Sequence, residues 1–160
     1  MIEYVDAELE TLCRACGLCC DGSLFGRVAL EPGEVVTARR RRLRVLDNGK
    51  AFEQPCSALS ERETTTGVWR LCAIYDERPL MCRSFACRLY DRHRREGGPL
   101  EPRLAAVRRV RGLVADLQAR GLSPADFDAE AQSPSRPGSA AMRAYGELQQ
   151  RLKDDFARAR

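Results

Sequence analysis

The sequence predicts a mainly α-helical protein with a small β-hairpin, on the basis of three features of the chain. All eight cysteines lie between residues 13 and 87. A short segment, 64–71, is rich in β-branched and aromatic residues, and apolar residues recur at helical spacing from about residue 100 onward. The length suits a single domain over 1–160. We expect a cysteine-cluster region, 1–95, to pack against a helical region, 100–160.

The first half of the chain predicts short elements between turns. An apolar run predicts a strand near 26–30, and the proline and acidic residues after it predict a helix over 32–43. Asn48 and Gly49 tolerate positive φ and predict a turn that leads the chain back toward Cys56.

The hairpin is predicted from segment 64–71. Its β-branched and aromatic residues favour extended backbone, and Gly67 interrupts them. We expect a strand pair that delivers Cys56 and Cys72.

A helix is expected after Asp76, which can cap it, with Pro79 in the first turn. The apolar residues expected to pack inward from this segment are Leu80, Met81, Phe85 and Leu89.

Two amphipathic helices are predicted in the second half. The first spans about 102–120, ends at Gly121 and carries an apolar stripe of Leu104, Val107, Val110, Leu113, Val114 and Leu117. The second spans about 139–158, and its apolar stripe is Met142, Tyr145, Leu148, Leu152 and Phe156. A short helix starting near Ser123 and a loop over 133–139 separate them. Such stripes form the core, although they can also fill a partner's groove.

The cysteine pattern indicates a metal–thiolate centre. Four cysteines lie within residues 13–20, and such soft donors select zinc, copper(I) or iron–sulfur clusters. The opening residues resemble no secretory signal, and no apolar run reaches the length of a membrane span, so we expect a cytoplasmic protein. In a reducing compartment, thiols serve as metal ligands more often than as disulfides. The cysteine region is therefore expected to be stapled by metal.

The spacing restricts which thiols can converge. If Gly17 adopts a left-handed conformation, Cys13, Cys16 and Cys19 can converge and Cys20 can serve elsewhere. Adjacent cysteines rarely chelate one ion comfortably, so Cys19 and Cys20 are expected to serve different centres or roles. Residues 82 and 87 are about 140° out of phase on a helix. Either the helix breaks near residue 84 or these two cysteines face different ligand sets.

The basic residues do not indicate a nucleic-acid-binding protein. The net charge is +4 when the thiols are counted as neutral, and thiolate ligands would offset it. The arginines of 39–42 are best interpreted as a solvated face at a helix end, where they favour the helix dipole. We therefore expect neither a nucleic acid nor a membrane as partner, and the sequence leaves a protein or small-molecule partner unidentified.

Two arginines near the cysteines are candidates for cofactor binding. Arg78 and Arg83 could donate hydrogen bonds to sulfur or hold a bound anion, and so raise the reduction potential of a cluster. The alternative is a surface ion pair with Asp76 or Glu77.

The remaining candidates are weaker. His93, the only histidine, lies among charged residues and is expected to be solvated rather than a ligand or a general base. Tyr75 and Trp69 are expected to cover the metal and keep water away from it.

The chain resembles the YkgJ-type CxxCxxCC family in three segments, which occur in the same order as in that family: 13–20, 56–59 and 71–87. That family is described as zinc- or iron-chelating. The resemblance implies metal chelation by the full set of cysteines, Cys13, Cys16, Cys19, Cys20, Cys56, Cys72, Cys82 and Cys87.

The ligand pattern favours iron–sulfur over zinc. No histidine lies among the ligands, and three cysteines at this spacing match a cluster-binding run better than paired zinc knuckles. We expect a 4Fe–4S centre with a redox or cluster-assisted role. The alternatives are a zinc-binding structural or interaction module without catalysis, and a metal carrier or sensor.

Overall fold

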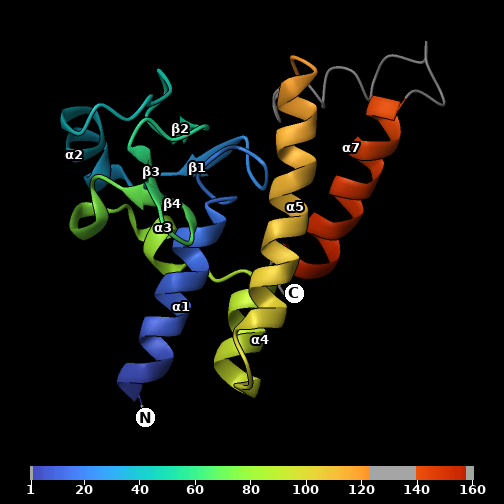
Figure 1. Cartoon of the computed structure of the whole chain (residues 1–160). Helices are drawn as coiled ribbons and strands as arrows, with labels where there is room; N and C mark the ends of the chain where they lie inside the picture. The colour runs from blue at the N-terminus through green and yellow to red at the C-terminus, as the bar shows by residue number, and fades with distance from the viewer. Residues whose placement is uncertain (1, 123–139, 158–160) are drawn as a thin grey trace. The chain divides into compact units, whose positions relative to one another are not determined.

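The computed structural model describes residues 2–122 and 140–157. The chain forms two compact units (Figure 1). The helical unit joins the chain up to Cys16 with the chain from Cys87 onward, and the strand unit consists of Gly17–Ala86. The boundary therefore falls at Gly17 and Ala86, and the N-terminal segment belongs with the C-terminal helices rather than with most of the cysteines.

The helical unit is built from α1 (Ile2–Cys16), α4 (Arg88–Glu96), α5 (Glu101–Ala119) and α7 (Ala140–Arg151), and α7 continues into a π-helical turn, η3 (Leu152–Phe156). Helix α5 contacts both α1 and α7, and α4 contacts α1 and η3 (Figure 1). None of the helices in the described part of the chain is both long and apolar enough to cross a membrane.

The two predicted amphipathic helices are confirmed as α5 and α7 with η3. Gly121 has a φ of +77° and follows Arg120, the C-cap residue of α5, as expected for a glycine that terminates a helix. The residues of the predicted stripes that are buried are Val107, Val110, Val114, Leu117, Leu148, Leu152 and Phe156. The expected short helix near Ser123 and the loop over 133–139 lie outside the described residues.

His93 is buried, contrary to the expectation of a solvated side chain. It is 1% exposed and shares the inward face of α4 with Leu89, four residues earlier. Its Nε2 lies 3.0 Å from Oε2 of Glu8 on α1. The sequence did not reveal this burial, because the residues on either side of His93 are charged. In the helix, only His93 of residues 91–95 is buried on the inward face.

The strand unit contains two antiparallel strand pairs. Strand β1 (Arg27–Ala29) pairs with β2 (Ala51–Glu53), and β3 (Leu59–Thr64) pairs with β4 (Gly67–Cys72). The second pair is the predicted hairpin, and its register places Leu59 opposite Cys72. A small apolar core underlies the unit and consists of Val28, Leu30, Ala38, Leu43, Phe52 and Ala58.

The helix predicted over 32–43 is shorter than expected. It begins as a 3-10 turn, η1 (Pro32–Glu34), and continues as α2 (Val35–Arg40). Arg42 has a φ of +59°, which turns the chain out of the helix. The predicted turn near Gly49 is present, with a φ of +67°.

The helix expected after Asp76 starts later than predicted. A 3-10 turn, η2 (Tyr75–Glu77), precedes α3 (Leu80–Ser84). The residue before a proline is disfavoured in the helical region, and Arg78 accordingly has a ψ of 140°, so Asp76 caps no helix that passes through Pro79.

The inward packing expected from this segment is only partly correct. Leu80 and Met81 are 48% and 39% exposed, because the short helix α3 ends before it can bury both. Leu89 is buried, and Phe85 packs edge-to-face on Phe25 with ring centroids 4.8 Å apart.

Candidate metal centre

Five thiols belong to the strand unit and come from four places along the chain. Cys19 and Cys20 follow α1 in a turn, and Cys56 lies between β2 and β3. Cys72 is the last residue of β4, and Cys82 is in the middle of α3. The unit thus gathers cysteines more than 60 residues apart in sequence.

The turn that carries Cys19 and Cys20 is made by Gly17. Helix α1 ends at Cys16, and Gly17 has the predicted positive φ, +65°. Its carbonyl accepts backbone hydrogen bonds from Cys20 at 3.0 Å and from Asp21 at 3.1 Å. The left-handed conformation of Gly17 thus allows a tight turn in which the Gly17 carbonyl accepts both hydrogen bonds.

Long-range backbone hydrogen bonds attach the other cysteine segments to this turn. The Cys56 N–H donates to the Cys20 carbonyl at 2.8 Å, and the Ala73 N–H donates to the Ala58 carbonyl at 2.8 Å. The side chains of Cys56 and Cys82 pack against the apolar core of the unit. The hairpin thus holds Cys72 beside the segment that begins at Cys56.

Gln54 contributes to the same arrangement and was not expected from the sequence. It is 9% exposed, and its side-chain N–H donates to the Cys19 carbonyl at 3.4 Å. The only sequence signal is its place two residues before Cys56, which is too weak to identify it.

The turn at Gly17 provides a test of this backbone. In Gly17→Ala, the new Cβ would lie 2.9 Å from Arg70 Cβ and closer still to Arg70 Cδ, in a left-handed conformation that alanine disfavours. We expect the free energy of unfolding to fall by about 1–3 kcal/mol. Urea unfolding measures the change. Gly26→Ala is the matched control, because nothing lies within 4 Å of its Cβ position, and an equal loss in both variants would contradict the role of Gly17.

The sulfur atoms of Cys19 and Cys20 lie 3.7 Å apart. Four sulfurs around one zinc at about 2.3 Å are separated by roughly 3.8 Å, so this adjacent pair has the spacing of a shared ion. The expectation that Cys19 and Cys20 serve different centres or roles stays a prediction. Within residues 2–122 and 140–157, however, no three Cys, His, Asp or Glu side chains are grouped closely enough to hold a single ion.

The five thiols influence one another's ionisation. The hydrogen bond between Cys19 and Cys20 lowers the pKa of Cys19 and raises that of Cys20, as in a pair that shares one proton. Burial raises the pKa of Cys56, and neighbouring Cys72 raises it further. Burial likewise raises the pKa of Cys72, and Cys19 adds to this effect. The unit therefore concentrates thiols whose joint ionisation needs a compensating positive charge.

Cys82 has the clearest single shift. Burial, then the nearby Cys56, Cys19 and Cys72, raise its pKa to about 12, while Arg78 acts in the opposite direction. The charge of Arg78 also acts on Cys19 and Cys72. Arg78 is thus close enough to three thiols to stabilise their anionic forms.

These shifts predict how the metal-free protein responds to alkali. The folded pKa of Cys82 lies above its ordinary value of 9.0, so its contribution to stability is present below pH 9 and is lost as the pH rises toward about 12. We expect the urea midpoint of metal-free protein to fall between pH 9 and 11. Cys82→Ser removes this titration and should make the fall shallower, while the raised pKa values of Cys20, Cys56 and Cys72 still contribute to it. A profile identical to that of the unsubstituted protein would contradict the assignment.

The other three cysteines belong to the helical unit. Cys13 and Cys16 lie on the last turns of α1, and Cys87 is the N-cap of α4, where its sulfur accepts a hydrogen bond from the Tyr90 N–H at 3.4 Å. Helix α3 ends at Ser84, so the helix breaks between Cys82 and Cys87, which was one of the two alternatives considered from the sequence. All eight cysteines lie in the described ranges, and none forms a disulfide there. Convergence of Cys13 and Cys16 with Cys19 stays a prediction.

The two candidate arginines have different surroundings. The Arg78 guanidinium stacks on the Tyr75 ring, 3.6 Å from its centroid, and its Nε–H donates to the Tyr75 carbonyl at 2.8 Å. Arg83 lines a cavity with Arg78. Among the described residues neither forms the surface ion pair considered from the sequence, and Glu77 pairs instead with arginines of the 39–42 run.

The expected aromatic cover is not formed by Tyr75. Tyr75 lies in the 3-10 turn η2 and is 54% exposed. Its ring stacks against the Arg78 guanidinium instead of covering the thiols. Trp69 is half-buried on β4, opposite Arg62.

Comparison with known proteins supports a metal-binding role for the chain. A family model, CxxCxxCC, described as "Putative zinc- or iron-chelating domain", matches residues 12–100, and this range contains all eight cysteines. No curated protein and no solved structure matched the chain. The matched range covers more than half of the sequence and includes the run at Cys13, Cys16, Cys19 and Cys20 that gives the family its name, so the chain belongs to the CxxCxxCC family of metal-chelating domains.

Proposed function

We propose that the thiols of the strand unit hold an iron–sulfur centre of the 4Fe–4S type, with a redox or cluster-assisted role. The candidate ligands within this unit are Cys19, Cys20, Cys56, Cys72 and Cys82. Four cysteine thiolates hold such a cluster, so the unit contains enough donors of the required softness. When bound, the cluster supplies one-electron chemistry.

The observation that carries this proposal is the spacing of the thiols. They are near enough to shift one another's pKa, yet no three metal-binding side chains in the described ranges group around a single ion position. A multinuclear cluster can take thiolates that come from several segments of the chain, because four cysteines hold one such cluster.

Arg78 is the proposed tuning residue of the centre. Its positive charge acts on Cys19, Cys72 and Cys82, and stacking on Tyr75 holds the guanidinium in place. A fixed positive charge beside an anionic cluster favours the reduced, more negative state and so raises the reduction potential.

Anaerobic purification with analysis for iron, acid-labile sulfide and zinc tests the proposal. We expect a brown protein with about four iron and four sulfide per chain that bleaches when dithionite is added. Arg78→Gln should keep the cluster and lower its reduction potential. A colourless protein with zinc and no sulfide would overturn the iron–sulfur proposal.

A zinc centre is the second candidate, and one distance favours it. The sulfurs of Cys19 and Cys20 are 3.7 Å apart, close to the roughly 3.8 Å separation of two thiolates on one tetrahedral zinc. In that case the strand unit would be a zinc-stabilised interaction module or would carry its ion to a partner. A stoichiometric zinc content that resists dialysis supports the structural module, whereas rapid loss to a competing chelator with the fold retained supports a carrier.

A further inference from the structure

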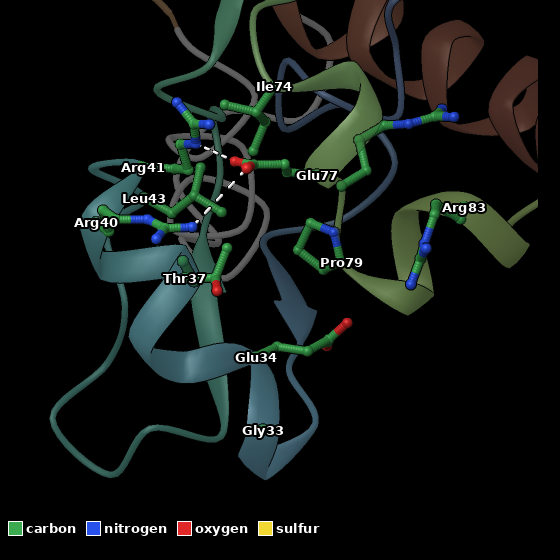
Figure 2. A pocket seen from close by; sticks show the side chains of 12 residues that line it. Gly33, Glu34, Thr37, Arg40, Arg41, Leu43, Ile74, Glu77, Pro79 and Arg83 are labelled. Atoms are coloured by element: carbon green, nitrogen blue, oxygen red, sulfur yellow. Dashed lines mark hydrogen bonds and ion pairs between the residues drawn. The ribbon is translucent and has the colours of Figure 1, made fainter.

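A cavity of about 310 Å³ lies within the strand unit, between α2 and the segment from Ile74 to Arg83 (Figure 2). This volume is at the lower end of the range for small-molecule sites, about 300–1,000 Å³. Six charged residues line it: Glu34, Arg40, Arg41, Glu77, Arg78 and Arg83.

Both carboxylates of the cavity are already engaged. The Glu34 oxygens accept backbone hydrogen bonds from Leu80 at 2.7 Å and from Glu31 at 3.0 Å. The Glu77 oxygens pair with Arg41 and, at 3.8 Å, with Arg40. Arg41 lowers the pKa of Glu77, which keeps this carboxylate ionised.

The arginines exceed the carboxylates, and two of them have no acidic partner. Four guanidiniums face two carboxylates, and neither Arg78 nor Arg83 forms an ion pair with any described residue. Arg83 reaches the cavity from α3, on the side opposite Arg40 and Arg41 (Figure 2). The cavity therefore has a net positive charge with donors on two sides.

Glu77 indicates what kind of group this cavity accepts. Figure 2 shows Arg40, the last residue of α2, and Arg41, which follows it, both directed at this carboxylate. The pair lies in solvent and is weakly held, as surface ion pairs are, so a ligand with more negative charge can replace it. Guanidinium groups bind carboxylate and phosphate oxygens in the same bidentate geometry.

We propose that this cavity binds a small oxyanion with two negative charges, a phosphate or a dicarboxylate, between Arg40 and Arg41 on one side and Arg83 on the other. Glu77 occupies the Arg40–Arg41 side when the anion is absent and is displaced when it binds. No cysteine lines this cavity, although Arg78 lines it and also acts on the thiols, and the proposal does not depend on which metal the thiols hold.

Isothermal titration of the full-length, metal-loaded protein with inorganic phosphate and, separately, with succinate tests this proposal at constant ionic strength. We expect one equivalent of at least one of the two anions to bind. Phosphate alone would assign a phosphate site, and succinate alone would assign a dicarboxylate site. Binding of neither anion to the folded protein would overturn the proposal.

Three substitutions distinguish a specific anion site from general electrostatic attraction to a positively charged surface. Arg83→Gln should weaken binding at least about fivefold, because it removes an unpaired donor. Glu77→Gln should tighten binding about threefold or more, because it removes the competing carboxylate. Arg39→Gln is the matched control, since Arg39 lies on the same helix but does not line this cavity, and its affinity should be unchanged. Equal weakening in Arg39→Gln and Arg83→Gln, or no gain in Glu77→Gln, would contradict the site.

Discussion

Replacing Cys72 with serine is expected to reduce the bound metal at least about tenfold, the largest effect of any single substitution considered. A serine hydroxyl is a harder and far weaker acid than a thiol, so it cannot supply the soft anionic donor that zinc or iron–sulfur centres require. Cys72 is the last residue of β4 and interacts with Cys19, Cys56 and Cys82, so its loss affects the centre directly. Elemental analysis of iron, sulfide and zinc per chain measures the effect.

Ala73→Ser is the matched control for this experiment. Ala73 is the exposed neighbour of Cys72, so the variant adds the same hydroxyl one residue away without removing a thiol. Its metal content should equal that of the unsubstituted protein. Retention of metal by Cys72→Ser, with the fold intact by circular dichroism, would exclude Cys72 as a ligand.

The same measurement on Cys87→Ser tests how far the centre extends. Cys87 belongs to the helical unit and caps α4, so a purely local role predicts a small loss of stability and full metal content. A loss of metal comparable with that in Cys72→Ser would instead place Cys87 among the ligands, as the family resemblance implies.

Removing the metal is expected to lower the stability of the strand unit strongly, so that it opens far more often, while the stability of the helical unit is unchanged. The strand unit has two small strand pairs and a core of only six buried apolar residues, so metal binding must supply much of its folding free energy. The amides of Val28 and Phe52 should lose protection against hydrogen exchange at least about a hundredfold when a chelator is added. Hydrogen-exchange mass spectrometry resolves the two units in one experiment.

Amides in the core of the helical unit are the internal control. Val110 and Val114 on α5 are fully buried and belong to a helix of 19 residues, so their protection should change by less than about twofold. Equal loss of protection in both units would mean that they unfold together. Unchanged protection in the strand unit would mean that its hydrophobic core suffices without metal.

The regular elements were predictable where a single pattern dominates. The stripe from Val107 to Leu117 identified α5, and Gly121 identified its end, because burial at helical period leaves a strong signal in the sequence. The hairpin was predicted from its β-branched residues. The start of α3 was missed because the restriction that Pro79 places on Arg78 competes with capping by Asp76.

Buried polar residues were the least predictable part of the chain. His93 lies among charged neighbours, and only the contact of α4 with α1 places its ring beside Glu8. The ion pairs of Arg40 and Arg41 with Glu77 were equally unpredictable. They form only because the segment after the β3–β4 hairpin folds back against α2. Such pairings join residues far apart in sequence and leave no local pattern.

By itself, the sequence determined the donor chemistry, the family and the glycine that ends α1 before Cys19. These follow from residue type and short spacing. Only the tertiary structure decided that five of the thiols share one small unit, and that Cys19 and Cys20 lie side by side. The physical reason is that the thiol arrangement depends on long-range bonds, such as that from the Cys56 N–H to the Cys20 carbonyl, which no local propensity encodes.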